Sequence, residues 1–314
     1  MVARRGIEGD RLTRTRFAPS PTGDLHLGSA WTAFASWVVA RRASGTCVLR
    51  FENLDTSRVI AGADARIQDD LRWLGLDWDG DPVHQSERAE LYGRTIEQLA
   101  AGGWVYPCDC SRTEIARAPS APHPGEESVY PGFCRDRDPN RAMKRPPALR
   151  LRIPETAVVS FEDGIAGKIT QSVSREVGDF VLRRGDGVFA YQIAVVVDDL
   201  AMGITDIVRG ADLVESTPRQ VWLAQLLGAR PPRYAHVPLV VTREGARLEK
   251  RTRGITIREL RQSGVHAERI IGSLAYGLGL ADTDRPATAS EVARSTAERT
   301  IEWRRRSWPV PEHW

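Results

Sequence analysis

A proline- and glycine-rich loop at residues 19–28 constrains the fold of this chain more than any other part of its sequence. Phe17 and Ala18 are predicted to end a short strand, because Pro19 and Pro21 prevent a strand or a helix from continuing. After the loop, apolar residues recur at the spacing of one helical face: Trp31, Phe34, Ala35 and Val38. The N-terminus of such a helix is a natural phosphate site, because its free amides and its dipole favour anions.

The composition of the same loop excludes two common nucleotide-binding motifs. It lacks the glycine and lysine spacing of a P-loop and the three glycines of a dinucleotide fingerprint. Gly23 and Gly28 leave the backbone free to approach a ligand closely, and His26 directly precedes the predicted helix. We infer a nucleotide site of another kind.

The overall composition is that of a globular protein with room for about two domains. The chain has 314 residues, 41% of them hydrophobic and 27% charged, and no apolar run reaches the roughly 18 residues of a membrane span. Its first 16 residues are polar and basic without the apolar segment of a secretory signal, so we expect a cytoplasmic protein with no membrane partner. A net charge of +3 does not require a nucleic-acid partner, and the basic cluster at 247–253 is explained equally well as a solvated face.

Strand and helix signals alternate over residues 15–105. Residues 47–51 predict a second buried strand that ends at Glu52, and a helical stripe follows before Gly75: Ala63, Ile67, Leu71 and Leu74. Such alternation favours a parallel, doubly wound sheet with right-handed crossovers. Ligands bind beyond the carboxyl ends of the strands in these sheets, and the opening loop and Glu52 both lie at such ends.

The pattern changes at residues 106–148, which hold three of the four cysteines and many prolines. This composition predicts an inserted subdomain that needs a staple other than a hydrophobic core. Short strand-like runs follow at 149–176, and residues 188–197 are predicted to be a strongly buried strand that ends in Asp198 and Asp199. We expect the sheet to resume with that strand. Residues after about 245 are predicted to be mainly helix and linker.

The cysteines of the insertion, Cys108, Cys110 and Cys134, point to a structural metal. Disulfides are rare in cytoplasmic proteins, and three thiols in a segment with little core favour zinc, which takes four tetrahedral ligands. The fourth ligand is open from the residues alone: His123 is the usual ligand type, whereas Tyr130 lies closer to Cys134. The alternative is three unrelated buried thiols.

Several motifs in a fixed order resemble the glutamyl-tRNA synthetases. His26-Leu-Gly-Ser29 corresponds to the histidine-containing HIGH motif of class I enzymes. The matching segments are 16–28, 51–55, 179–183, 190–199, 203–205, 207–212 and 217–220, and the similarity covers about residues 14–255. The resemblance implies an α/β fold with a Rossmann-like catalytic domain in two halves, 14–105 and 178–245. A zinc-containing subdomain at 106–177 separates them, and the signature loop and a short helical part occupy 246–314.

The end of the chain points to one branch of this family. Only about 60 residues follow Lys250, too few for the helical anticodon-binding domain of a full glutamyl-tRNA synthetase. This length and the cysteine pattern resemble the glutamyl-Q tRNA(Asp) synthetases. That family activates L-glutamate with ATP and transfers it to the queuosine base in the anticodon loop of tRNA(Asp). Its zinc is held by three cysteines and a tyrosine, which implies Tyr130 as the fourth ligand. We expect a monomer.

Glutamate carries two carboxylates and an ammonium group, so its pocket needs two cationic groups and one anion. Arg16 and Arg209 can bind carboxylates bidentately, and Glu52 can hold the ammonium. The resemblance implies a glutamate site made of these three residues with Tyr191, Ala18 and Ser20.

The ATP site is implied at His26, Gly28, Ser29 and Lys250, with Mg²⁺ bridging the phosphates. His26 and Lys250 are the expected catalytic residues. The family's mobile KMSKS loop corresponds to residues 247–251, where Arg247 replaces the first lysine and Glu249 replaces the serine. Lys250 keeps the phosphate-binding position. Lysine is rare here, at three of 44 basic residues, which indicates that a compact ammonium group is wanted at Lys250.

Two other functions fit the same motifs. A minimal glutamyl-tRNA synthetase would charge tRNA(Glu) at its 3′ end. A synthetase-like protein with a degenerate signature loop would bind glutamate or tRNA without catalysis.

Overall fold

A parallel sheet forms the centre of the structure, a computed structural model that describes residues 12–116, 129–242, 245 and 255–311. One part of the sheet has the order β1, β2, β3, and the other has the order β9, β10, β6, β7. Their bounds are β1 Arg14–Phe17, β2 Thr46–Phe51, β3 Val83–His84, β6 Val158–Asp163, β7 Gly167–Ser172, β9 Asp206–Gly210 and β10 Arg233–Val237. The two parts meet beside β1, where the amide of Thr205 donates a hydrogen bond of 2.9 Å to the carbonyl of Arg14. All pairs are parallel except the β6–β7 hairpin, so the predicted parallel sheet is confirmed.

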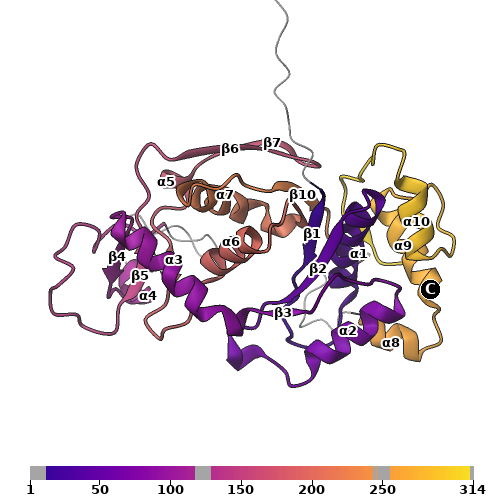
Figure 1. The fold of residues 1–314 in the computed structure, drawn as a ribbon, viewed down its shortest axis with the longest axis horizontal. Helices are drawn as coiled ribbons and strands as arrows, with labels where there is room; N and C mark the ends of the chain where they lie inside the picture. The colour runs from indigo at the N-terminus through magenta and orange to yellow at the C-terminus, as the bar shows by residue number, and fades with distance from the viewer. Residues whose placement is uncertain (1–11, 117–128, 243–244, 246–254, 312–314) are drawn as a thin grey trace, which may run out of the picture.

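Helices cover both faces of this sheet (Figure 1). The helix predicted after the opening loop is α1, Leu27–Arg42, and the predicted stripe before Gly75 is α2, Ala63–Trp73. One core joins α1 and α2 to the C-terminal helices α8 Ile257–Gln262, α9 Ala267–Leu278 and α10 Ala289–Thr296. A second core joins α3 Ala89–Ala101, α6 Tyr191–Ala201 and α7 Thr217–Leu226. The structure therefore confirms the helical C-terminal part, which packs on α1.

The prediction of a strand at residues 188–197 is wrong. Helix α6 begins at Tyr191, and its buried residues run without a break from Ile193 to Asp199. The apolar run indicated burial correctly, but a short segment buried on all sides has no periodicity that separates a strand from a helix. Asp198 and Asp199 therefore lie inside a buried helix instead of at a strand end.

A separate antiparallel sheet holds the cysteine region. Its strands are β4 Val105–Cys108, β5 Ala148–Leu151 and β8 Val181–Arg183, with α4 Arg112–Ala116 after β4. The boundaries proposed at residues 106, 178 and 246 stay a prediction. Hydrogen bonds cross the one at 178, because β8 pairs with β5, and β6 pairs with β10 of the central sheet.

The remaining elements are short. Helix α5, Val173–Glu176, follows the β6–β7 hairpin, and β11 Val240–Val241 pairs with β12 Trp308–Pro309. The rings of Trp31 and Trp308 stack at 5.1 Å between centroids, which ties the end of the described chain to α1. Within the described residues, every helix is too short or too polar to span a bilayer.

Candidate active site

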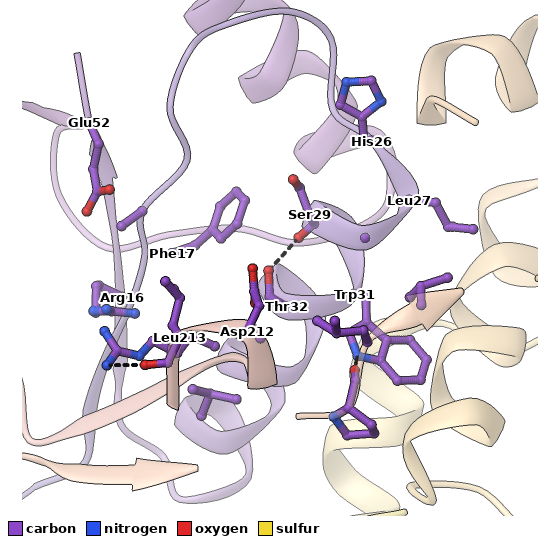
Figure 2. Close-up of a pocket in the computed structure, with 18 of the residues that line it drawn as sticks. Arg16, Phe17, His26, Leu27, Ser29, Trp31, Thr32, Glu52, Asp212 and Leu213 are labelled. Carbon is purple, nitrogen blue, oxygen red and sulfur yellow. Dashed lines mark hydrogen bonds between the residues drawn. The ribbon is translucent and has the colours of Figure 1, made fainter. Parts of the chain in front are cut away.

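A cleft of about 580 Å³ opens at the carboxyl ends of β1, β2 and β9, beside the N-terminus of α1 (Figure 2). Most of the predicted site residues line it: Arg16, Ala18, His26, Gly28, Ser29, Glu52, Tyr191 and Arg209. Ser20 is exposed and is not part of the lining. Lys250, Arg247 and Glu249 lie outside the described residues. The carboxyl edge of the parallel sheet thus gathers side chains that are far apart in the sequence.

The opening loop carries His26 to the start of α1. His26 is the N-cap residue of this helix and makes no capping hydrogen bond with its side chain. Backbone hydrogen bonds fix the loop to the segment after the signature loop: Leu27 donates to the carbonyl of Ile255 at 2.9 Å, and Ile257 donates to that of Leu25 at 2.8 Å. In Figure 2, His26 and Ser29 lie on one side of the cleft, and Arg16 and Glu52 lie on the other. Helix-terminal amides and carboxylate-binding groups therefore face the same space.

Gly28 leaves room in this cleft. A Cβ atom built on Gly28 has no atom within 4 Å, and its backbone is not in the left-handed region. Neither strain nor packing within the described protein therefore requires glycine here. The open space lies over the first turn of α1, where a ligand can approach the backbone.

Two buried arginines share one carboxylate beneath the cleft. The Oδ1 atom of Asp199 accepts hydrogen bonds from Arg16 Nε at 3.2 Å and from Arg50 Nη1 at 2.7 Å. Arg50 is fully buried and also donates to Glu52 Oε1 at 3.3 Å. Asp199 on α6 therefore orients Arg16, and Arg50 on β2 orients Glu52.

The pKa values of this group reflect burial and pairing. Burial raises the pKa of Asp199, but the guanidinium groups of Arg16 and Arg50 outweigh it and leave that pKa below its ordinary value. Burial alone would lower the pKa of Arg50, yet the surrounding carboxylates raise it on balance. Burial raises the pKa of Glu52, and Arg50 and Arg16 counteract only part of the rise. A cationic ligand group beside Glu52 would stabilise its ionised form.

Arg209 lines the cleft with a buried guanidinium group. It is 4% exposed, its Nε donates to His236 Nε2 at 3.0 Å, and its Nη2 donates to Thr217 Oγ1 at 2.7 Å. Within the described part of the chain, its Nη1 atom has no hydrogen-bond partner. A buried guanidinium nitrogen without an acceptor is costly, so an anionic ligand in the cleft would satisfy it.

Tyr191 lies in the first turn of α6 and is 36% exposed to the cleft. Desolvation within the site and the Glu52 carboxylate raise the pKa of its phenol, so the hydroxyl stays protonated at neutral pH and can donate a hydrogen bond. Asp212 also lines the cleft and lies between its two sides in Figure 2.

The three predicted cysteine ligands meet at the end of β4, where Cys108 is the last residue of the strand. The sulfur atoms of Cys108, Cys110 and Cys134 all lie within 4.8 Å of one another, and the Cys110 and Cys134 sulfurs are 3.5 Å apart. The Tyr130 hydroxyl lies 3.3 Å from the Cys108 sulfur and 3.6 Å from that of Cys110. His123, the other proposed ligand, lies outside the described residues. The cluster has the donor set of a tetrahedral metal site and no disulfide.

Burial and hydrogen bonding shift the pKa values of the cluster's ligand atoms in different directions. Burial would raise the pKa of the Cys108 thiol, but the hydrogen bond with Tyr130 helps to leave it below its ordinary value. Burial raises the pKa of the Cys110 thiol to about 11 and raises that of the Tyr130 phenol as well. Ligands of this kind bind metal in the deprotonated form, and a divalent cation supplies the charge that stabilises it. Arg141 also donates to the Cys134 sulfur at 3.3 Å, as an outer hydrogen bond to a thiolate would.

Sequence reasoning missed Arg50, Asp199 and His236 as parts of the site. Arg50 lies within the predicted strand that ends before Glu52, but nothing in the spacing indicates that it faces the same carboxylate as Arg16. A single buried histidine on a strand usually has a structural role. The signal for Asp199 and His236 is their contact with Arg16 and Arg209, and the signal for Arg50 is its contact with Asp199 and Glu52. Only the fold provides these contacts.

Comparison with known proteins agrees with this architecture. The sequence model of the class I tRNA synthetases (E and Q), catalytic domain, matches residues 13–307. A glutamyl-Q tRNA(Asp) synthetase of Nitratidesulfovibrio vulgaris is 48% identical over 283 residues, 86% of this chain and 87% of the relative. The protein of that name in Geobacter sulfurreducens is 45% identical over 292 residues, 92% of this chain and 89% of the relative.

Solved structures of glutamate-specific enzymes share the fold. A glutamate tRNA ligase of Elizabethkingia meningosepticum, in complex with its amino acid, is 28% identical with a TM-score of 0.77; the match covers 90% of this chain and 64% of that one. The glutamate-tRNA synthetase of Elizabethkingia anophelis is 26% identical with a TM-score of 0.81, over 96% of this chain and 68% of that one. The chain spans slightly less than two thirds of the first of these structures. It belongs to the class I tRNA synthetases, and within them to the glutamyl-Q tRNA(Asp) synthetase family.

Proposed function

We propose that this protein activates L-glutamate with ATP to glutamyl-adenylate and transfers the glutamyl group to the queuosine base of tRNA(Asp). The observation that carries the proposal is one cleft in which cationic and anionic side chains face the N-terminus of α1, where His26 is the N-cap residue. The two relatives described above align with most of this chain and with most of their own length, and they bear the name of this activity. ATP and tRNA(Asp) are the substrates that this family membership implies.

The proposed glutamate site uses the charges of the cleft. Arg209 offers its free Nη1 donor to one carboxylate of glutamate, and Arg16 offers its guanidinium to the other. Glu52, oriented by Arg50, receives the ammonium group, and Tyr191 adds a hydroxyl donor. Ala18 contributes to the wall, whereas Ser20 lies outside the lining.

Activation is an attack of the glutamate α-carboxylate on the α-phosphate of ATP, with pyrophosphate as the leaving group. The protein's contribution is to position the reactants and to stabilise the negative charge that develops. His26 and the first turn of α1, where Gly28 and Ser29 lie, face the proposed triphosphate position. Mg²⁺ would enter with ATP as part of the substrate and would offset the negative charge of the phosphates.

The signature loop is proposed to bring Lys250 to the phosphates. Residues on both sides of it, Val240 and Ile255, line the cleft. Glu249 places a negative charge next to Lys250 in the sequence, and a negative charge beside the phosphates would be repulsive.

We further propose that Cys108, Cys110, Tyr130 and Cys134 hold one structural zinc ion in the inserted subdomain. The sulfur distances and the nearby phenol support this assignment. The lack of an anticodon-binding domain, the monomeric state and the cytoplasmic location stay predictions.

Glutamate-dependent exchange of pyrophosphate into ATP, measured without tRNA, tests the activation step. We expect exchange with glutamate and little with glutamine or aspartate. Arg16→Ala is expected to abolish it, whereas Arg94→Ala, at an exposed ion pair with Glu90, is the matched control and is expected to retain it. Absence of exchange in the unaltered protein would favour a binding protein without catalysis.

Labelled glutamate and nuclease fragments of the tRNA then locate the acceptor. We expect label in the anticodon-loop fragment of queuosine-containing tRNA(Asp) and none in tRNA(Asp) that lacks queuosine. Equal labelling of the two would refute the acceptor. Label at the 3′ end of tRNA(Glu) would establish the minimal synthetase instead.

A further inference from the structure

A buried chain of side chains runs behind Arg209, away from the cleft. The Nδ1 atom of His236 lies 2.6 Å from Asp163 Oδ2, and the Nε2 atom of His236 accepts the Nε–H of Arg209 at 3.0 Å. The side chains of Asp163 and His236 are 0% exposed. The strand pairing creates the arrangement, because the parallel register of β9 and β10 sets Arg209 directly beside His236.

The hydrogen bonds fix the protonation of this imidazole. The guanidinium group of Arg209 can only donate, so the Nε2 atom of His236 must carry a lone pair. The remaining ring proton is then on Nδ1 and is donated to Asp163. Asp163 is an acceptor here, because its Oδ1 atom also accepts the amides of Ile165 at 3.0 Å and Ala166 at 2.8 Å.

Thr217 does not remove this requirement. Its hydroxyl has one proton, which it donates to the carbonyl of Leu213 at 3.1 Å while it accepts from Arg209 Nη2 at 2.7 Å. His236 Nε2 lies 3.1 Å from the same oxygen. A proton on Nε2 would meet the Nε–H of Arg209 at 3.0 Å, so that two donors would face each other. In the doubly protonated ring it would also bring a second positive charge next to the guanidinium group.

We propose that His236 is a positioning residue for glutamate recognition, which holds the Arg209 guanidinium toward the cleft only while its ring is neutral and protonated on Nδ1. The inference rests on the proposed function, since it takes Arg209 as a ligand of a glutamate carboxylate. His236 binds the Nε atom of Arg209, whereas Thr217 binds its Nη2 atom. The Nη1 atom of Arg209 therefore remains for the ligand. Substrate binding is then coupled to the protonation of a residue outside the cleft lining.

The groups around His236 agree with a neutral ring. Those that face it are Asp163 from β6, Arg209 from β9, Arg16 from β1, Thr217 from α7 and, on its own strand, Tyr234, whose ring stacks at 6.0 Å. Burial lowers the pKa of His236, and the cationic arginines add to this effect against the opposing influence of Asp163. The ring is therefore neutral at pH 7 and gains its proton only below the ordinary histidine pKa of about 6.5.

Replacement by phenylalanine and by glutamine separates positioning from packing. His236→Phe keeps a buried ring but removes the acceptor, so we expect the KM for glutamate in pyrophosphate exchange to rise roughly 10- to 100-fold, the range for one charge-assisted hydrogen bond. The KM for ATP is expected to stay unchanged. His236→Gln supplies an amide oxygen that does not titrate, so it is expected to restore much of the affinity at pH 7.

The pH profile gives a readout that a purely structural role would not move. The KM for glutamate of the unaltered protein is expected to rise as the pH falls below about 6.5, and His236→Gln is expected to lack this acid limb. His266→Gln, at an exposed position, is the matched control and is expected to keep it. An unchanged KM in His236→Phe, or the same acid limb in His236→Gln, would overturn the proposal.

Nitrogen-15 NMR of the imidazole tests the inference independently of activity. We expect a neutral, Nδ1-protonated ring at pH 7. This tautomer in a protein that shows no glutamate-dependent exchange would refute the proposed function alone. An Nε2-protonated or doubly protonated ring at pH 7 would refute the positioning role of His236.

Discussion

Replacement of Asp199 by asparagine tests the electrostatic account of the cleft most directly. The Asp199 carboxylate is 4% exposed and accepts from two arginines, Arg16 and Arg50, that are 4% and 0% exposed. Removal of one partner from a buried ion pair costs about 3–5 kcal/mol, because the charge left behind stays buried without compensation. Asparagine keeps the shape and one acceptor oxygen, and Glu52 loses a repulsive neighbour. We therefore expect a loss of about 3 kcal/mol in the free energy of unfolding at pH 7.

The sign of the pH dependence follows from the pKa of Asp199, which is lowered in the folded state. A carboxylate of this kind contributes stability that is fully present above its unfolded pKa of about 3.9 and is lost as the pH falls through the folded pKa. Asparagine does not titrate. The difference in the free energy of unfolding between the unaltered protein and Asp199→Asn should therefore be largest at pH 7 and should become smaller below about pH 4.

Urea unfolding, followed by tryptophan fluorescence at pH 7, 4 and 3.5, measures this difference. Asp136→Asn is the matched control, because Asp136 pairs with Arg152 at the surface with its side chain 84% exposed. We expect the control to lose less than about 1 kcal/mol. A loss in Asp199→Asn no larger than in the control, or a gap that stays constant from pH 7 to 3.5, would refute the reasoning.

Three further changes are predicted to have separate effects. Cys134→Ser is expected to lower the zinc content measured by atomic emission and to lower the melting temperature, and chelation of the unaltered protein should do the same; equal melting with and without chelator would contradict a structural metal. Thr288→Ala removes the capping box of α10 and should reduce the free energy of unfolding in urea by about 1 kcal/mol, with no effect on exchange activity. Gly277→Ala should reduce the free energy of unfolding by about 1–3 kcal/mol in the same assay, because the new Cβ atom would lie 2.7 Å from the rings of Trp31 and Trp308. Alanine favours helices over glycine, so a stabilised variant would show that helix propensity outweighs this clash.

The local features of the site could be predicted from the sequence. Pro19 and Pro21 end β1, the apolar stripe of α1 follows, and Glu52 comes directly after β2. These features depend on backbone restrictions and side-chain periodicity, which act between near neighbours. The meeting of the opening loop with Glu52 also follows from the sequence, because parallel strands end at the same edge of a sheet.

The strand predicted at residues 188–197 is a helix, and the local sequence pattern could not have indicated this. A run such as Ile193 to Val197 records that a segment is buried, but it does not record what surrounds it. Packing among α3, α7 and the sheet made this segment a helix, and that choice placed Asp199 beneath Arg16.

The sequence by itself determined three features of this protein. The first is a strand, a loop and a helix with the chemistry to bind an anion, and the second is a carboxylate at the end of a neighbouring strand. The third is a set of three thiols close enough along the chain to share a metal. Only the tertiary structure decided what orients the cleft arginines. Arg209 and His236 are 27 residues apart, and His236 and Asp163 are 73 apart. Hydrogen bonds over such separations depend on strand pairing and register, which the whole sheet sets and which no local pattern of residues encodes.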